Sequence, residues 1–228
     1  MSAYRRVTDY RTSQIQQLPN VNVFLENKLQ SEDVLGLGFD HVVTATGSTW
    51  ELSALDSHFV PKPIEKQQGF FTPDDVLKGC ELQSPVVVYD FDYYYMGGLI
   101  AEYISDLGHE VTVITPFENV SPWSFMSNEV NAIKARMHEK NIKTITENRI
   151  SEFKNQVLTL THKVTKEIMD VDRSSLVIVG MRLPTNSLFK ELSANQSLLD
   201  DAGIKTLKNI GDSNSPGAVV HAVYAGHM

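Results

Sequence analysis

The chain has 228 residues, 42% of them hydrophobic and 21% charged, which is typical of a globular protein with one large domain or two smaller ones. Its net charge of −8 gives no electrostatic reason to bind nucleic acid or an anionic membrane, and no run approaches the ~20 apolar residues of a membrane span. Because the N-terminus lacks the apolar stretch of a signal peptide and Cys80 is the only cysteine, we expect a cytoplasmic protein without disulfides.

The first quarter of the chain is predicted to hold one helix and two strands. Apolar residues at helical spacing predict a helix over residues 4–18, which the dipeptide "PN" ends. Alternation in "VNVFL" predicts a strand at 21–25, Ser31 is expected to cap a short helical turn, and β-branched residues predict a strand at 40–47. Between 48 and 71 the periodicity disappears, and we interpret this segment as a connection between domains.

The middle of the chain has the spacing of parallel α/β structure. Thr72 is expected to cap a short helix that Gly79 ends. A buried strand at 85–90, a helix at 96–108 and a strand at 109–115 then follow so closely that the two strands need a parallel crossover connection.

The remaining elements alternate between helices and short strands. Ser127 is expected to cap a helix that runs to residue 141, and residues 143–172 predict a third strand and a small antiparallel meander. A buried strand at 175–180 leads through a polar stretch to a strand in "LKNIGD" and a C-terminal helix. We expect "HVVTAT" and "LKNIG" to pair in one sheet, because short buried strands need partners.

The residues that could hold a metal are dispersed. No two of the seven histidines stand four residues apart on a predicted helix, and one cysteine excludes a four-cysteine iron–sulfur or zinc site. We therefore predict no metal site, and we interpret Cys80 as a half-buried thiol without a chemical role.

The turn after the first buried strand of the middle region stands where dinucleotide-binding folds have a glycine-rich loop. That loop needs one glycine for a tight turn, one for close approach of the pyrophosphate and one for packing of helix against strand. Gly97 fits the packing position, with Gly98 beside it. Asp92 and either Tyr94 or Asp90 occupy the other two positions, depending on the direction of counting. The loop is also about two residues too long for the pattern.

Two readings of this loop remain open, and both predict poor nucleotide binding. Asp90 and Asp92 are either an internal mimic of phosphate that closes the pocket, or capping and turn residues. The tyrosines at 93–95 could form a platform for a ring, although packing against the next layer is commoner. Thr115 and Pro116 stand where an acidic residue would hold a ribose, so the signal for an active NAD(P) site is weak.

Four segments resemble the C-terminal part of the trimethylamine dehydrogenase family: "VVTATGSTW", "VVVYDFDYYYMGGLIAEYISDLGHEVTVITP", "SLVIVGMRLPTNSL" and "NIGDSNSPGAVVHAVYAGH". The family also includes histamine dehydrogenase, dimethylamine-type dehydrogenases and, more distantly, 2,4-dienoyl-CoA reductase. The resemblance covers nearly the whole chain, and the degenerate loop is similar to that of the amine dehydrogenase branch.

This resemblance implies an α/β flavoprotein fold. In the family, an N-terminal TIM barrel carries FMN and an iron–sulfur cluster, and the C-terminal half has the two-domain fold of glutathione-reductase-like enzymes. The implied architecture is a Rossmann-like NAD(P)-type domain with a degenerate fingerprint at 51–199. It is inserted in an incomplete FAD-type, ADP-binding domain formed by residues 1–50 and 200–228.

The resemblance also assigns candidate cofactor-binding residues at two places. Ala45, Thr46 and Gly47 match the strand-to-loop exit of the FAD-type domain, and Gly211 and Asp212 match its return strand, where the aspartate faces a flavin ribityl or phosphate. Asp90, Asp92, Gly97 and Gly98 form the degenerate NAD(P) loop. The sequence "MRLPTN" looks like the loop that closes the inserted domain, with Met181 in place of its glycine.

Two departures from the family lead us to expect a fragment of an oxidoreductase. Nothing before Tyr4 supplies the first βαβ unit of an FAD-type domain, and the barrel with its FMN site and cysteine cluster is absent. We expect no catalytic residue and no cofactor in the isolated chain, and FAD or ADP in the intact enzyme. The implied partners are the missing barrel, with a second copy of the chain and an electron-transfer flavoprotein as further candidates.

Two other functions stay open at this point. The chain could be the NAD(P)H-binding domain of a dienoyl-CoA-reductase-like enzyme, which tight binding of NADH would favour. It could also be a stand-alone adaptor that binds protein in the old nucleotide cleft, which a gene without an upstream barrel would favour.

Overall fold

The computed structural model describes residues 2–227, and these divide into two compact units. The first unit comprises the chain up to Val42 together with Ser187–Leu207, and the second comprises Val43–Asn186 together with the chain from Lys208 onward. Within the described residues, no helix is both long and apolar enough to cross a membrane, and no three metal-ligating side chains come together.

The first unit is helical. It contains α1 (Ser2–Gln16), α2 (Ser31–Gly36), α6 (Ser187–Ser193) and α7 (Gln196–Asp201), and its small core consists of Val34, Leu192, Leu199 and Ile204. The helix predicted near the N-terminus is confirmed as α1. Ser31 is the first residue of α2, and Gln30 rather than Ser31 is its N-cap.

The strand predicted at 21–25 is wrong. These residues have no regular structure, and Phe24 and Leu25 are 77% and 83% exposed. The reason is that an alternating pattern forms a strand only where a neighbouring strand supplies hydrogen bonds and a packed face. The pattern here has neither.

A two-stranded sheet joins segments far apart in sequence. It consists of β1 (His41–Thr44) and β14 (Thr206–Asn209), so the predicted pairing of these two segments is confirmed. Their expected burial is wrong, since only Thr44 among them is fully buried. The pair is anchored where the two strands end, because Thr44 Oγ1 donates to Asn209 Oδ1 at 2.8 Å.

The second unit is built on a five-stranded parallel sheet. Its order is β5 (Phe70–Phe71), β12 (Ser175–Val179), β6 (Val86–Asp90), β7 (Val111–Ile114) and β8 (Lys143–Ile145). The predicted crossover from β6 to β7 is confirmed, with α4 (Met96–Asp106) between them. Every residue of β6, β7 and β12 is buried, which explains why their sequences are mostly apolar, with one polar residue in each.

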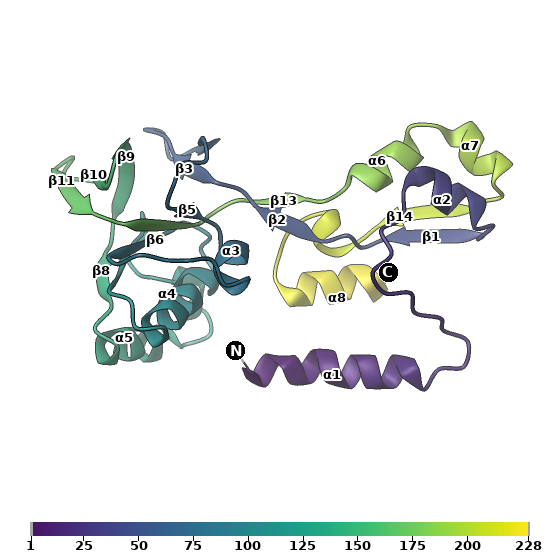
Figure 1. The fold of residues 1–228 in the computed structure, drawn as a ribbon, viewed down its shortest axis with the longest axis horizontal. Coiled ribbons are helices and arrows are strands. Elements are labelled where there is room, and N and C mark those ends of the chain that lie inside the picture. Colours follow the sequence, from purple (N-terminus) through teal and green to yellow (C-terminus); the bar gives the residue numbers. More distant parts are fainter. Residues whose placement is uncertain (1, 228) are drawn as a thin grey trace. The chain divides into compact units, whose positions relative to one another are not determined.

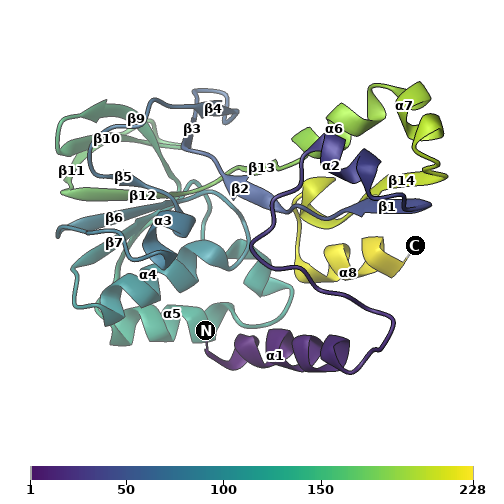
Figure 2. The same cartoon turned by 45° about the vertical axis from the view of Figure 1, so that its right-hand side comes forward.

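Different layers cover the two faces of this sheet, as Figures 1 and 2 show. One face packs against α3 (Pro73–Leu77), α4 and α5 (Val130–Glu139), through a core that includes Val88, Ile104 and Val177. The other packs against the antiparallel meander β9 (Asn148–Lys154), β10 (Val157–His162) and β11 (Ile168–Asp172). Thr72 caps α3 as predicted, with its Oγ1 accepting from Asp75 N, whereas Glu129 rather than Ser127 is the N-cap of α5.

Residues 48–71 hold more structure than the expected connection. They form β2 (Ser48–Trp50), β3 (Ser53–Leu55), β4 (Pro61–Pro63) and β5, of which β3 pairs with β4. β2 pairs with β13 (Arg182–Pro184). Strands of two or three residues are too short to show a period of two, so the sequence pattern missed them.

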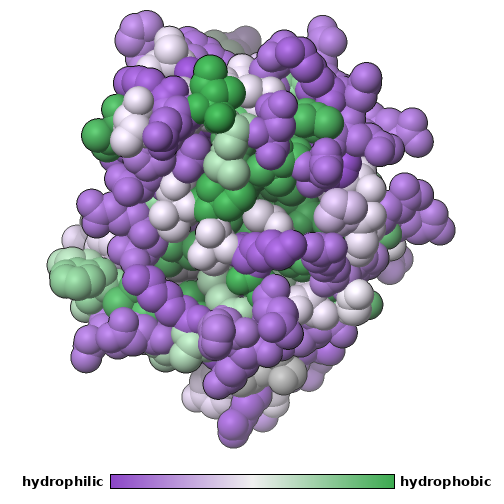
Figure 3. Space-filling model, turned by 90° about the vertical axis from the view of Figure 1, so that its left-hand side faces the viewer, coloured by the Kyte–Doolittle hydropathy of each residue, from purple (hydrophilic) through white to green (hydrophobic). Residues whose placement is uncertain are grey.

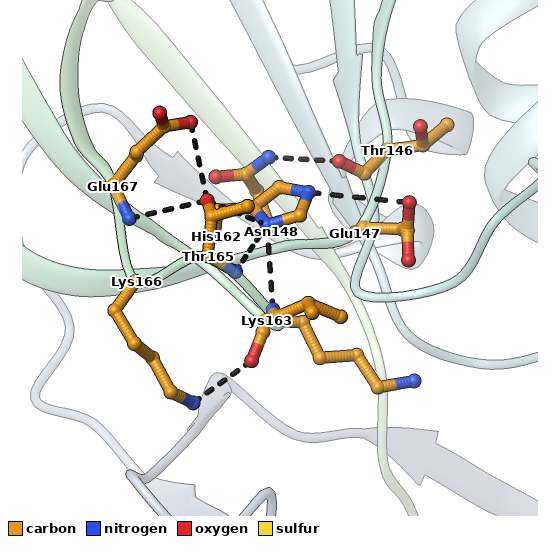
Figure 4. Close-up of polar contacts among 9 residues, drawn as sticks. Thr146, Glu147, Asn148, His162, Lys163, Thr165, Lys166 and Glu167 are labelled. Carbon is orange, nitrogen blue, oxygen red and sulfur yellow. Dashed lines mark hydrogen bonds and ion pairs between the residues drawn. The ribbon is translucent and has the colours of Figure 1, made fainter.

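A polar network closes the turn between β10 and β11 (Figure 4). His162 Nδ1 accepts from the backbone amides of Thr165 at 3.1 Å and Val164 at 3.3 Å, while Nε2 lies 3.9 Å from a carboxylate oxygen of Glu147. Glu147 O accepts from Lys163 N at 2.6 Å. Because one ring nitrogen holds this turn and the other faces Glu147, we interpret His162 as a structural residue.

Candidate functional site

The end of β6 brings Asp90 into the interior of the second unit. Its side chain is fully buried, its Oδ1 accepts from Asp92 N at 3.1 Å, and its Oδ2 has no hydrogen-bond partner among the described residues. The hydroxyls of Ser121 and Ser124 are likewise buried without a partner. Buried polar atoms of this kind are uncommon, because each costs free energy unless it is paired.

Asp90 is packed directly on the start of α4. A Cβ atom added to Gly97 would lie 2.0 Å from Asp90 Cγ, so the carboxyl occupies the space that a side chain at Gly97 would need. A Cβ on Gly98 would lie 3.0 Å from Ser121 Oγ. The two glycines thus allow a close approach, but the group that approaches Gly97 is the carboxyl of Asp90.

The two carboxyls of this loop are perturbed in the same direction. Burial raises the pKa of Asp90 from 3.8 to about 7, with the nearby charge of Asp92 adding to the rise and the amide of Asp92 opposing it. Burial also raises the pKa of Asp92, against the attraction of Arg182. The bond from Asp92 N to Asp90 Oδ1 joins residues two apart, as in an Asx turn, which agrees with the turn reading of Asp90. Tyr95 is the N-cap of α4 and has no side-chain capping bond.

The three tyrosines of the loop pack against neighbouring side chains. The ring of Tyr93 lies edge-on to Phe117 at 5.3 Å, and that of Tyr94 lies 5.5 Å from Trp123. Tyr95 Oη donates to Glu129 Oε2 at 3.0 Å. The tyrosines thus form part of an aromatic cluster (Tyr93, Tyr94, Phe117 and Trp123), and the packing reading is the one that agrees with these contacts.

A second group of sequence-predicted residues lines one open pocket of about 430 Å³. Ala45, Gly47, Gly211 and Asp212 all lie on its wall, together with part of α8 (Val219–His227). Thr46 does not: its Oγ1 donates to the backbone carbonyl of Thr185.

Arg182 organises this pocket, and sequence reasoning did not single it out. Its Nη1 donates to Asp212 Oδ2 at 3.0 Å, its Nη2 donates to Gly217 O at 3.2 Å, and its guanidinium lies 5.3 Å from the ring centre of Trp50. Asp212 also accepts from Ser48 Oγ at 3.1 Å and from Gly217 N at 3.1 Å. The only earlier signal was the position of Arg182 in "MRLPTN", directly after a buried strand.

The residues around the β6–α4 loop do not fit a dinucleotide. The Asp90 carboxyl packs against Gly97, the glycine at the helix–strand packing position, and the loop places a second acid, Asp92, near it, where a phosphate-binding loop has no negative charge. Thr115, at the end of β7, is fully buried, and its Oγ1 accepts from Phe117 N at 3.3 Å, so it presents no carboxylate to a ribose.

Among its described lining residues, the pocket of Ala45, Gly47, Gly211 and Asp212 offers a single cation, Arg182, to an anionic ligand. Asp212 and the glycines leave room for a hydroxyl-bearing or apolar group, but Arg182, the cation on its wall, is already paired with Asp212.

Comparison with known proteins identifies clear relatives. Residues 71–171 match the family described as the OYE-like second alpha/beta domain. Dimethylamine dehydrogenase of Hyphomicrobium sp. (strain x) is 25% identical over 247 aligned positions, which cover 96% of this chain and 33% of that protein.

Two solved structures are similar over almost the whole chain. Histamine dehydrogenase from Rhizobium sp. 4-9 superposes with a TM-score of 0.92 at 36% identity, and 6-hydroxypseudooxynicotine amine oxidase from Pseudomonas geniculata N1 superposes with a TM-score of 0.90 at 30% identity. Each alignment covers 99% of this chain and 34% of the other. The chain therefore spans about a third of the length of these relatives.

Proposed function

Because this chain is homologous to the C-terminal region of the trimethylamine and histamine dehydrogenase family, we propose that it is the nucleotide-binding-fold part of a flavin-dependent amine dehydrogenase. In the intact enzyme it would serve as a scaffold that docks on an N-terminal barrel carrying FMN and an iron–sulfur cluster. It would supply no catalytic residue of its own.

One observation carries the scaffold role: the loop between β6 and α4 holds two acids in place of the glycines of a phosphate loop, and the first of them, Asp90, is fully buried against Gly97. An NAD(P)-type domain with this loop closed can keep its fold without its cofactor. The packing of Tyr93 and Tyr94 into the aromatic cluster further supports a loop that serves structure.

The pocket around Ala45, Gly47, Gly211 and Asp212 is the place where this chain would contact FAD or ADP in the intact enzyme. A bound flavin would supply electron transfer, and a bound ADP would supply stability only. The role of this chain would be to hold Asp212 in place through Arg182 and Ser48. The contacts to the phosphates would come from another part of the enzyme.

NADH and NADPH are expected to bind no more tightly than millimolar. At pH 8, above the Asp90 pKa of about 7, a carboxylate facing a phosphate should cost a few kcal/mol at an effective dielectric of ~20, or ~100-fold in affinity. Isothermal calorimetry at pH 8 measures this directly. A micromolar dissociation constant, weakened by Asp92→Gly, would support the reductase reading and overturn ours.

The purified chain is expected to be colourless. The phosphate loop of an FAD site is absent from this sequence, and the Gly211–Asp212 turn offers too few contacts to retain flavin. Absorbance between about 350 and 500 nm, the range of flavin bands, tests this after purification without added cofactor. A stoichiometric flavin spectrum would mean that the pocket is sufficient by itself.

A further inference from the structure

Arg173 is a buried cation without an acidic partner. Arg173 stands between β11 and β12 in the sequence, and the residue is 3% exposed. No carboxylate of the described chain forms an ion pair with it. Burial lowers the pKa of its guanidinium. Because a buried charge is costly unless it is paired, such a residue points to a missing counter-ion.

The contacts of Arg173 leave most of its donors unused. Nη2 donates to Asn155 O at 2.6 Å, and the guanidinium stacks over the ring of Phe70 at 4.6 Å. Among the described residues, Nε is buried without an acceptor. A guanidinium can donate five hydrogen bonds in a planar fork that matches a carboxylate.

A pocket of about 500 Å³ opens beside this guanidinium. It lies at the amino ends of β5, β12 and β6, which is the edge of the sheet opposite to the Asp90 loop. Figure 3 views the molecule from the side at which these amino ends lie in Figure 1, and hydrophilic side chains there surround a strip of hydrophobic ones.

Gly69 keeps the approach to Arg173 open. Its φ is +80°, and an added Cβ would lie 2.8 Å from Ser174 O and 3.4 Å from Arg173 Nη1. A larger residue would therefore strain the backbone and stand against the guanidinium. The remaining wall carries side-chain amides, among them Gln68 and Gln83, and one acid, Glu81.

We propose that this pocket binds a small monoanionic carboxylate, with Arg173 as its charged partner and the wall amides as hydrogen-bond donors. One cation facing one acid on the wall favours a single negative charge over a phosphate dianion. The site is separate from the nucleotide loop and does not depend on the function proposed above.

The test is a titration of the full chain with sodium acetate at constant ionic strength, followed by the ¹H–¹⁵N resonance of the Arg173 Nε–H and by the melting temperature. We expect a saturable shift and a rise in melting temperature, as for any ligand that binds only the folded state. Inorganic phosphate should bind about tenfold more weakly than acetate.

Two variants and one control make the result specific. Arg173→Gln should weaken acetate binding by about tenfold or more, and Gln68→Glu, which keeps the guanidinium and adds a competing charge, should also weaken it. Arg11→Gln removes an equal charge from the exposed face of α1 and should leave it unchanged. The proposal fails if acetate shifts the wild-type resonance no more than chloride does, or if Gln68→Glu leaves the affinity unaltered.

Discussion

Replacing Gly97 by alanine is expected to destabilise the chain by about 2–4 kcal/mol, which lowers the melting temperature by roughly 5–15 °C. The added Cβ would lie 2.0 Å from Asp90 Cγ, and both residues are fully enclosed, so either the carboxyl must leave its site or α4 must move away from β6. This cost exceeds the gain of about 1 kcal/mol in helix propensity. Thermal and urea unfolding followed by circular dichroism measure it.

The double variant Asp90→Ala with Gly97→Ala separates this clash from other effects. Removing the carboxyl frees the space for the new methyl group, so the double variant should be more stable than the sum of the two single changes predicts. Gly98→Ala is the matched control in the same helix, because the atom nearest to its Cβ would be Ser121 Oγ at 3.0 Å, and it should therefore cost less. Additive effects of the two substitutions would show that Asp90 and Gly97 are not in contact.

Compared with the wild type at the same pH, the Asp90→Asn variant is expected to become more stable as the pH rises. The pKa of Asp90 is 3.8 in its ordinary environment and about 7 in the fold, so the folded state holds a proton that the unfolded state has lost between these values. Its contribution is fully present below pH 3.8 and is lost as the pH rises through 7, for a change of up to about 4 kcal/mol. Asparagine does not titrate, so it removes this loss.

The measurement is the free energy of unfolding in urea at pH 5 and pH 8 for the wild type and for Asp90→Asn. The difference between the two proteins isolates Asp90, because groups with the opposite trend, such as Asp75 with its lowered pKa, are common to both. We expect the free energy of unfolding of Asp90→Asn, relative to that of the wild type, to be higher at pH 8 than at pH 5. An equal difference at both pH values would place the Asp90 carboxyl in water.

The central sheet could be predicted because its strands are long and wholly buried. β6 and β12 have four apolar residues each and β7 has three, and α4 has Ile100 and Ile104 on its inner face at helical spacing. The helices α6 and α7 were missed, since seven and six residues give too few turns for a periodic signal.

The candidate site was only half visible in the sequence. The glycine pattern located the β6–α4 loop and its aspartates, but burial of Asp90 against Gly97 depends on how the helix settles on the strand, which no local pattern records. The same limit on local sequence patterns applies to Arg182 and Arg173. Each is a single arginine beside a buried strand, and its partners Asp212 and Asn155 become neighbours only through the fold.

The two tryptophans of the chain stand at the two places where its nucleotide sites would be. Trp123 lies in the aromatic cluster of the β6–α4 loop, and Trp50 lies beneath Arg182 at the Asp212 pocket. Because indole emission responds to the polarity and charge around the ring, the chain carries a separate intrinsic fluorophore for each site. Trp50→Phe and Trp123→Phe would therefore divide its fluorescence into one signal from the β6–α4 loop and one from the Asp212 pocket, where we propose that flavin or ADP binds.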